Sequence, residues 1–578
     1  MNQSIDDPIF QVTSLDDTHC PEEVNTSTCI DKSVDDLTFQ VELLDVTQFP
    51  KEGITLKCMN EFVSDCGGHS ALINMTTTDV CERYLKPRTN AYKSSYCQYL
   101  KLTNNHVGRC GTATVFISHA WKFLFLEVVK TLEYHFRNEA DDIIIWFDLF
   151  SNNQHGAPQL DFNWWCTTFK SAIAELGRTV MILTPWADPI PLTRSWCLYE
   201  LYCTAVTGAV FEVAMTSTEQ EKFLLSVVED EEVVLEMIGQ VNIERSEAWS
   251  EADRDRIFEV VSQTIGCDRL NRLVFTKLQQ WVSDCVLDAM AQTDDEARKN
   301  MLRRAYGVLL RNYGKYEEAR PVLELALSES RRLLDSDKSR QEETMLVLYH
   351  LGWLLDDIGE QKAALPMYEE CLERRRQVLG EHHEKVLDTM NTMALLNFSM
   401  GNRRRAKKIL ESCLLSARTH LGLLHRTTLS VLNNSATLLC ALGEDNEQAE
   451  QILKESLELH TAFFQGRHPK TITCASNLGY FYSEQGRYEE SLELYSSVLQ
   501  DRRTKLGNDH PDTISSMNNL ASLLSSMNRR AEARLLLGEC VERGSSSMGA
   551  AHPDVLMYKN NLRCLEKIKK IKRSLNIL

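Results

Sequence analysis

The stretch HPKTITCASNLGYFYSEQGRYEESLELYSSVLQDRRTKLGNDHPDT, residues 468 to 513, decides the fold of the C-terminal half of this chain. It contains one helical pattern on each side of Gly486. A histidine-proline pair begins the stretch, and a second such pair stands near its end. The same turn residue recurs along the chain, at Gly314, Gly359, Gly401, Gly443, Gly486 and Asn528, with spacings of 45, 42, 42, 43 and 42 residues. A period of this length predicts an array of stacked helix pairs from residue 296 to residue 578.

Two further markers keep the same register. A small residue follows each turn residue by five or six positions, at Ala319, Ala364, Ala406, Ala449, Ser491 and Ala533. A histidine, often followed by proline, recurs at His383, His425, His468, His510 and His552. We predict that the small residues allow close contact between the two helices of a unit and that the histidines lie in the turns between units. A single helix pair cannot bury its apolar face alone, so stacking of neighbouring units supplies the core.

These markers together resemble the tetratricopeptide repeats of the kinesin light chain type. In that family, asparagines on the first helix of each unit face a concave groove and bind extended peptides. The resemblance therefore implies a protein or peptide partner, because an amide side chain offers both a donor and an acceptor to a peptide backbone. The alternative is that some asparagines cap or bridge neighbouring helices. The matching positions are Asn391, Asn433 and Asn518. Asn434, Asn477 and Asn519 each stand one residue after the matching position of their unit.

The groove is not uniform, because position 476 is serine and position 349 is tyrosine. No sustained heptad pattern precedes the array, which argues against a motor light chain. At the C-terminus, an i, i+3 stripe predicts a capping helix whose lysines face solvent. A nuclear-import or lipid-binding patch in KIKKIKRSLNIL is the alternative. The stripe consists of Leu562, Leu565, Ile568 and Ile571.

The segments before the array differ in character. Residues 1 to 36 hold nine acidic residues and one lysine, so we expect an acidic, largely disordered tail over residues 1–47. Residues 48–110 mix short helical patterns with turns and predict a small helical lead-in. Residues 111–290 contain four apolar strand patterns alternating with helices, which predicts a parallel, flavodoxin-like sheet followed by a helical extension. The strand patterns are GTATVFISHAW (111–121), IIIWFDLF (143–150), RTVMILTPW (178–186) and VFEVAM (210–215).

Three local sequences in this region resemble the TIR domain: TVFISHAW (114–121), IIWFDLF (144–150) and SWCLYEL (195–201). The resulting fold class is a multi-domain chain, with an α/β TIR-like domain followed by an all-α solenoid of tetratricopeptide repeats. Enzymatic TIR domains cleave the bond between nicotinamide and ribose in NAD, and Glu200 matches their essential glutamate. The resemblance thus implies catalysis by Glu200, with NAD as a substrate and no bound cofactor.

One carboxylate suffices for such a reaction, because nicotinamide is a cationic leaving group that needs no proton. Trp196 could stack on a flat base, and Asp148 follows a strand where ligands of parallel sheets bind. His119, Lys122 and Arg194 are further binding candidates. The alternative is that Trp196 and Glu200 are one core residue and one solvated residue of a helix, and that Asp148 only caps a loop.

Two segments depart from the family pattern. Residues 184–196 place three prolines before the WCLYE helix, and residues 151–165 form an unusual loop after the second strand. No G-x-x-x-x-G-K-[ST] sequence occurs, which excludes a P-loop switch. Activation would then come through the repeats or through self-association of TIR-like domains.

Composition narrows the functional class further. The net charge of −19 opposes binding to nucleic acid. The eighteen cysteines show no spacing typical of a zinc site, and no apolar run reaches the length of a membrane span. We therefore expect a cytoplasmic signalling protein without a metal, whose repeats bind a partner and whose TIR-like domain hydrolyses NAD on activation. A non-enzymatic adaptor or scaffold is the alternative, and a cargo adaptor of the kinesin light chain type is a third.

Overall fold

The computed structural model describes most of the chain from residue 50 onward. Residues 49–578 form one compact unit, and the predicted acidic tail at residues 1–47 lies outside the described residues. The described ranges are 50–139, 143–155, 162–229, 251–264, 266–336, 340–442, 446–464, 469–506, 510–547 and 553–574, with residue 508 and separate positions between 234 and 248.

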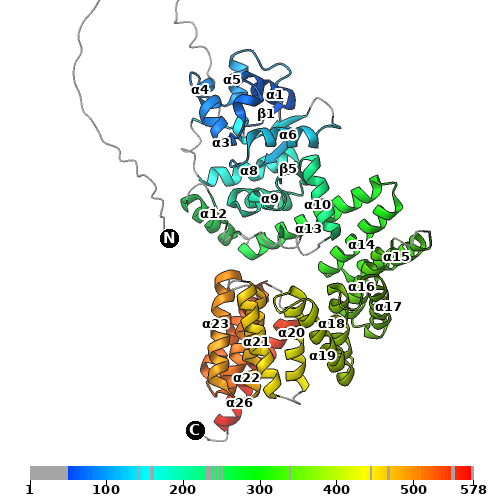
Figure 1. The fold of residues 1–578 in the computed structure, drawn as a ribbon. Coiled ribbons are helices and arrows are strands. Elements are labelled where there is room, and N and C mark those ends of the chain that lie inside the picture. The colour runs from blue at the N-terminus through cyan, green and yellow to red at the C-terminus, as the bar shows by residue number, and fades with distance from the viewer. Residues whose placement is uncertain are drawn as a thin grey trace, which may run out of the picture. The chain divides into compact units, whose positions relative to one another are not determined.

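A six-stranded sheet organises the α/β region, residues 50–292, in the order β2-β1-β4-β3-β5-β6 (Figure 1). Strands β4, β3, β5 and β6 are parallel, as the four apolar patterns predict. Their order along the sheet is that of flavodoxin-like doubly wound sheets. The strands are β1 (Glu52–Thr55), β2 (Cys110–Thr112), β3 (Val115–Ser118), β4 (Ile144–Trp146), β5 (Arg178–Ile182) and β6 (Val210–Ala214).

The segment 48–110, expected as a separate helical lead-in, instead contributes to this sheet. Strand β1 pairs antiparallel with both β4 and β2, and the predicted strand at 111–121 is divided between β2 and β3. Gly53 permits the close approach of β1, because a Cβ atom there would lie 2.2 Å from the Ile145 carbonyl oxygen. Short-range periodicity did not reveal these strands, since their pairing joins residues about 50 to 90 positions apart.

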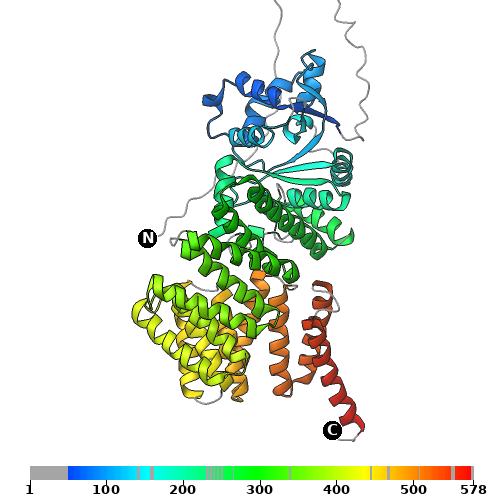
Figure 2. The ribbon, with the colours of Figure 1, turned by 90° about the vertical axis from the view of Figure 1, so that its right-hand side faces the viewer.

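Helices cover both faces of the sheet, because alternate strand residues point to opposite sides (Figure 2). Val115 and Ile117 pack with the N-terminal helices, whereas Phe116 packs with the helices that follow β4. The helices of the α/β region are α1 (Leu56–Asp65), α2 (His69–Leu72), α3 (Thr77–Val80), η2 (Cys81–Leu85), α4 (Lys86–Thr89), α5 (Tyr96–Leu102), α6 (Phe125–His135), α7 (Asp148–Ser151), α8 (Phe162–Leu176), η4 (Ile190–Thr193), α9 (Ser195–Thr207), α10 (Ser217–Glu229), α12 (Glu251–Thr264) and α13 (Cys267–Gln292).

The repeat array, residues 296–574, consists of six helix pairs and a final helix. Helices of one pair pack on each other, and each second helix packs on the first helix of the next pair. The array comprises α14 (Glu296–Asn312), α15 (Tyr316–Ser336), α16 (Gln341–Asp357), α17 (Gln361–Leu379), α18 (Glu384–Ser399), α19 (Arg403–His420), α20 (Arg426–Leu442), α21 (Asn446–Phe463), α22 (Pro469–Glu484), α23 (Tyr488–Leu506), α24 (Pro511–Ser526), α25 (Arg530–Ser547) and α26 (Pro553–Ser574).

The repeat markers have the predicted structural roles. The described turn residues all adopt positive φ, from 64° at Asn528 to 82° at Gly401, which ends the first helix of each unit. All six small residues are fully buried between helices. The histidines are more specific than predicted: His383, His425 and His510 cap the following helix, because Nδ1 accepts the backbone N–H two residues later. Gly443, His468 and His552 lie outside the described residues.

Helix α14 joins the array to the α/β region. Its residues Leu302, Ala305 and Leu309 belong to the same hydrophobic core as α9 and α13. Buried Arg304 donates one hydrogen bond to the Val228 carbonyl oxygen at the end of α10 and another to Glu343 of α16. The first helix of the array is therefore packed as part of the α/β region.

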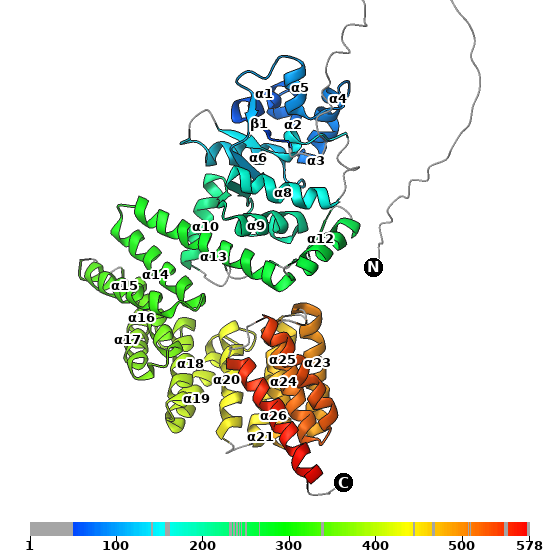
Figure 3. The ribbon, with the colours of Figure 1, turned by 180° about the vertical axis from the view of Figure 1, so that it is seen from behind.

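At the other end, α26 packs on α25 (Figure 3). Tyr558 and Leu565 are buried in the last hydrophobic cluster, and Leu562 packs against it. The first half of the predicted apolar stripe therefore faces the array, as a capping helix requires. The side chains of Ile568 and Ile571 lie outside the described residues.

Candidate functional site

Polar side chains from three elements meet at the carboxyl ends of β3 and β4. Ser118 ends β3, Asp148 begins α7 directly after β4, and Glu200 lies in the second turn of α9. The Ser118 hydroxyl donates a hydrogen bond of 2.5 Å to Glu200 Oε2. His119 Nδ1 lies 3.6 Å from Asp148 Oδ1. The structure thus brings together three residues singled out in the sequence, His119, Asp148 and Glu200. Together with Ser118 we call them the carboxyl-edge cluster.

Burial changes the protonation of this cluster. Glu200 is only 9% exposed, and burial raises the pKa of its carboxyl to about 8. Burial likewise raises the pKa of Asp148 to about 6 and lowers the pKa of His119 to about 3. At neutral pH, Glu200 is therefore mostly protonated and His119 is neutral. Within the described part of the chain, His119 Nε2 and Asp148 Oδ1 are buried without a hydrogen-bond partner.

Sequence reasoning missed two residues of this site. Ser118 holds Glu200 in place, and the Trp121 indole N–H donates a 2.6 Å hydrogen bond to Asp148 Oδ2. A polar residue at the end of an apolar strand was the available signal for Ser118, since strand ends of parallel sheets face ligands. No comparable signal identified Trp121, because its contact with Asp148 depends on how two loops meet.

The other three candidates of the α/β region make their described contacts outside the cluster. Trp196 is half-buried and packs edge-on against Phe169 and Tyr199, with ring centroids 5.6 and 6.3 Å away. Lys122 is exposed, and its amine lies 3.7 Å from a Glu247 carboxylate oxygen. Arg194 precedes α9 and forms a backbone bridge with Glu247. Trp196 and Glu200 therefore contact different surroundings although they are four residues apart.

The predicted asparagines of the array form a ladder between successive first helices. Asn434 donates to Asn391 at 3.1 Å, and Asn477 donates to Asn433 at 3.0 Å. Asn518 continues the pattern by accepting a 3.0 Å bond from Asn561. The bridging alternative therefore describes part of their role. Asn433, Asn434, Asn477 and Asn519 keep partly exposed side chains, whereas Asn391 and Asn518 are each 7% exposed.

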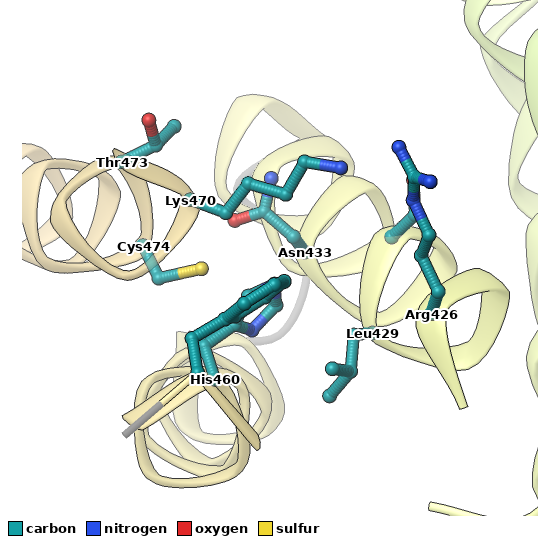
Figure 4. Close-up of a pocket in the computed structure, with 9 residues that line it drawn as sticks. Arg426, Leu429, Asn433, His460, Lys470, Thr473 and Cys474 are labelled. Carbon is teal, nitrogen blue, oxygen red and sulfur yellow. The ribbon is translucent and has the colours of Figure 1, made fainter. Parts of the chain in front are cut away.

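A pocket of about 190 Å³ opens beside this ladder, between α20, α21 and α22 (Figure 4). Arg426 and Lys470 extend over it from the first turns of α20 and α22, and Asn433 lies between them. Its wall also contains the buried ring of His460, whose Nδ1 donates to the Ser456 carbonyl oxygen at 2.7 Å. The remaining lining residues are Leu429, Ser430, Phe464, Thr473 and Cys474.

Two further properties bear on function. Within the described ranges, no three His, Cys, Asp or Glu side chains are grouped as a metal site would need. Over the same ranges, no helix combines the length and apolarity required to cross a bilayer.

Comparison with known proteins identifies the array. Residues 344–384 and 386–426 match one family model described as a tetratricopeptide repeat, and residues 427–500 and 475–544 match another. The C-terminal array consists of tetratricopeptide repeats. A comparison with curated proteins gives no match.

Several solved structures are similar to part of this chain. BtubC (BKLC) from P. vanneervenii is 20% identical, covers 41% of this chain and 94% of its own, and has a TM-score of 0.36. TPR-like repeats from Podosopora anserina, assigned to a kinesin light chain, are 20% identical over 35% of this chain and 94% of their own, with a TM-score of 0.31. NprR in complex with its cognate peptide NprX is 14% identical over 62% of this chain and 84% of its own, with a TM-score of 0.36.

Proposed function

We propose that this protein is a cytoplasmic scaffold whose tetratricopeptide repeats bind an extended segment of a partner protein along the first helices α18 to α24. The ladder of asparagines is the observation that carries this proposal. Each amide has two donor hydrogens and an acceptor oxygen, and a bond to one neighbouring asparagine uses only part of that capacity. Asn391 and Asn477 also donate to Ser430 and Thr437. Among the described contacts, this leaves part of their acceptor capacity, the amide hydrogens of Asn433 and one amide hydrogen of Asn434. The remaining donors and acceptors can pair with a peptide backbone whatever its sequence.

The ladder also prepares the surface for binding. Bonds between Asn391 and Asn434, and between Asn433 and Asn477, hold these side chains in defined positions before a partner arrives. A preorganised surface loses less side-chain entropy on binding, so a larger part of the interaction energy appears as affinity. Bridging and peptide binding are therefore compatible roles for the same amides.

Site-specific photocrosslinking tests this proposal in cells. A photoreactive residue would replace Tyr480, which is 55% exposed on first helix α22, or Leu415, which is 70% exposed on second helix α19. We expect discrete crosslinked partners from position 480 and none of the same partners from position 415. Equal crosslinking from both positions, or crosslinks from position 415 alone, would remove the proposed binding surface.

NAD hydrolysis in the α/β region is a second candidate, favoured by the carboxyl-edge cluster. Its members come from the ends of neighbouring parallel strands, which is where doubly wound sheets bind ligands. Two carboxyls with raised pKa values and two buried polar atoms without partners among the described residues are typical of functional sites. This supports the TIR-like assignment of Glu200, although its burial means that a substrate could reach it only after the surrounding segments move.

The enzymatic candidate has a direct test. Purified full-length protein, alone and brought together by an appended dimeriser, would be incubated with NAD, and nicotinamide release would be measured. We expect release that Glu200→Gln abolishes and that dimerisation increases, because the proposal includes self-association of TIR-like domains. Absence of release in every state leaves the non-enzymatic scaffold as the function of the whole chain. Release that survives Glu200→Gln would instead remove Glu200 from the reaction.

A further inference from the structure

The pocket between α20, α21 and α22 is strongly biased in charge. Arg426 and Lys470 are the two cationic side chains that line it, and none of the nine described lining residues is acidic. The chain as a whole has 82 acidic and 63 basic residues, so the described lining of this pocket departs from the average of this protein. Burial lowers the pKa of His460, which keeps its ring neutral at neutral pH, so Arg426 and Lys470 are the charged groups among the described lining residues.

Hydrogen-bond donors accompany these charges. Thr473 and Ser430 contribute hydroxyl groups, and Asn433 contributes its amide. Figure 4 shows the Lys470 side chain reaching from α22 across Asn433 toward the Arg426 side of the pocket. Because α20 and α22 both begin here, the positive ends of two helix dipoles also face this part of the surface.

We infer that this pocket binds a phosphorylated serine or threonine side chain of the partner protein. A carboxylate has one negative charge and two oxygens, which a single arginine can satisfy in bidentate fashion. A phosphate group has roughly −1.5 to −2 charges and three strong acceptor oxygens, which match two cations and several further donors. A volume of about 190 Å³ has room for roughly 13 water molecules at ~15 Å³ each, and so accommodates the phosphate and the stem of its residue.

This inference rests on the proposed function in one respect, because it assumes that the ligand is a segment of a protein. Phosphate recognition beside the asparagine ladder means that two neighbouring sets of side chains bind different parts of the same partner segment. The amides of Asn434 and Asn477 bind backbone, and the pocket, with Asn433 among its donors, binds one modified side chain. Phosphorylation of the partner would then switch its binding to the scaffold on.

The test uses full-length protein and small probes, so it does not depend on knowing the partner. The probes are N-acetyl-phosphothreonine N-methylamide, the unphosphorylated threonine compound, the glutamate compound and inorganic phosphate. Binding is followed by ³¹P line broadening for the phosphorus-containing probes and by saturation transfer for the others. We expect saturable binding of the phosphothreonine probe and at least tenfold weaker binding of the other three probes.

Two double variants locate the binding. Arg426→Gln/Lys470→Gln removes the pocket cations, and we expect roughly tenfold or greater loss of affinity, since charged hydrogen bonds contribute most in such sites. Arg404→Gln/Lys408→Gln removes the same charge from exposed positions of α19 that do not line the pocket, and should leave the affinity within twofold. Circular dichroism melting confirms that both variants remain folded.

Each other outcome overturns the inference. Preference for the glutamate probe means a carboxylate pocket, and equal or tighter binding of inorganic phosphate means a site for a free anion. Equal binding by both double variants means that the phosphate binds elsewhere, and no binding of any probe means no anion site. If the phosphothreonine probe binds as expected but photocrosslinking finds no partner at position 480, the scaffold proposal fails while the pocket assignment stands.

Discussion

The α/β region and the repeat array place their buried polar groups in different ways. In the α/β region, the hydrogen bond between Ser118 and Glu200 joins residues 82 positions apart that no common pattern connects. In the array, the bonds Asn391 to Asn434 and Asn433 to Asn477 join residues 43 and 44 positions apart, which is one repeat period. Polar contacts of the array therefore follow from the register of the sequence, whereas those of the α/β region follow only from its assembled sheet.

The difference also concerns stability. Each unit of the array contacts only its neighbours, so its energetics approximate a sum of local terms. The α/β region concentrates several buried titratable groups at one place, where their energies depend on one another. The following substitutions test this contrast, beginning at the junction of the two regions.

Removal of Arg304 should produce the largest effect, because this residue contacts both regions. Arg304→Met leaves Glu343 and the Val228 carbonyl oxygen without their common donor. We expect a loss of about 3 to 5 kcal/mol in the free energy of unfolding. Calorimetry should then show two separate transitions, in place of the single transition we expect for the wild type.

The neighbouring Arg303→Met serves as control, since Arg303 bonds only within α14 to Asn300 among its described contacts. It should cost only about 1 kcal/mol, as the loss of one half-buried hydrogen bond within a helix does. If both variants melt alike, the junction is not held by Arg304, and the two regions are coupled by apolar packing alone.

The carboxyl-edge cluster predicts a pH-dependent effect at Glu200. Its folded pKa of about 8 exceeds the ordinary value of 4.5, so the folded state binds more protons than the unfolded state between these values. Stability from this group is therefore present below pH 4.5 and is lost as the pH rises toward 8. Glu200→Gln, which cannot ionise, should gain on the order of 3 kcal/mol relative to wild type between pH 5 and pH 8.

Chemical denaturation of both proteins across this pH range measures that difference. A constant difference would show that Glu200 titrates near its ordinary pKa and is solvated in the folded protein. Substitutions of the ladder asparagines should give no comparable pH-dependent term, because amide side chains do not titrate.

A turn residue of the array should produce a smaller and strictly local effect. Gly401 has φ of 82°, and a Cβ atom added there would have no atoms within 4 Å, so only backbone conformation disfavours a side chain. Gly401→Ala should cost roughly 1 kcal/mol. Gly401→Asn should cost less, because Asn528 adopts the equivalent conformation with φ of 64°. Thermal melting compares the two, and an equal loss would point to steric crowding that the structure does not contain.

The helix-capping histidines should give the smallest effect. His510 caps α24 by accepting the Asp512 backbone N–H at 3.1 Å. His510→Ala should cost about 0.5 to 1 kcal/mol, and His510→Asn should restore most of it, since asparagine is a strong N-cap residue. Hydrogen exchange at the first turn of α24 reports the change locally. Protection lost equally in both variants would mean that the ring packs and does not cap.

Much of the candidate binding surface could be predicted, because its signals recur. The turn residues, the small residues and the asparagines stood at matching positions of successive units. In the structure the described turn residues end helices, the small residues pack between helices, and most of the asparagines bridge first helices. The site in the α/β region was predicted only in part. Glu200 and Asp148 were found through their local sequences, but Trp121 was missed because its bond to Asp148 joins two loops 27 residues apart.

By itself, the sequence determined the array, since helix pairing, turns and the contacts between units all act within about 42 residues of chain. Only the tertiary structure decided that β1 and β2 extend the parallel sheet, that Glu200 is buried against Ser118, and that α14 belongs to the core of the α/β region. The physical reason is the distance along the sequence between the residues that contact each other. Periodic local bonds leave a pattern in the sequence, whereas strand pairing and burial depend on the whole assembled sheet.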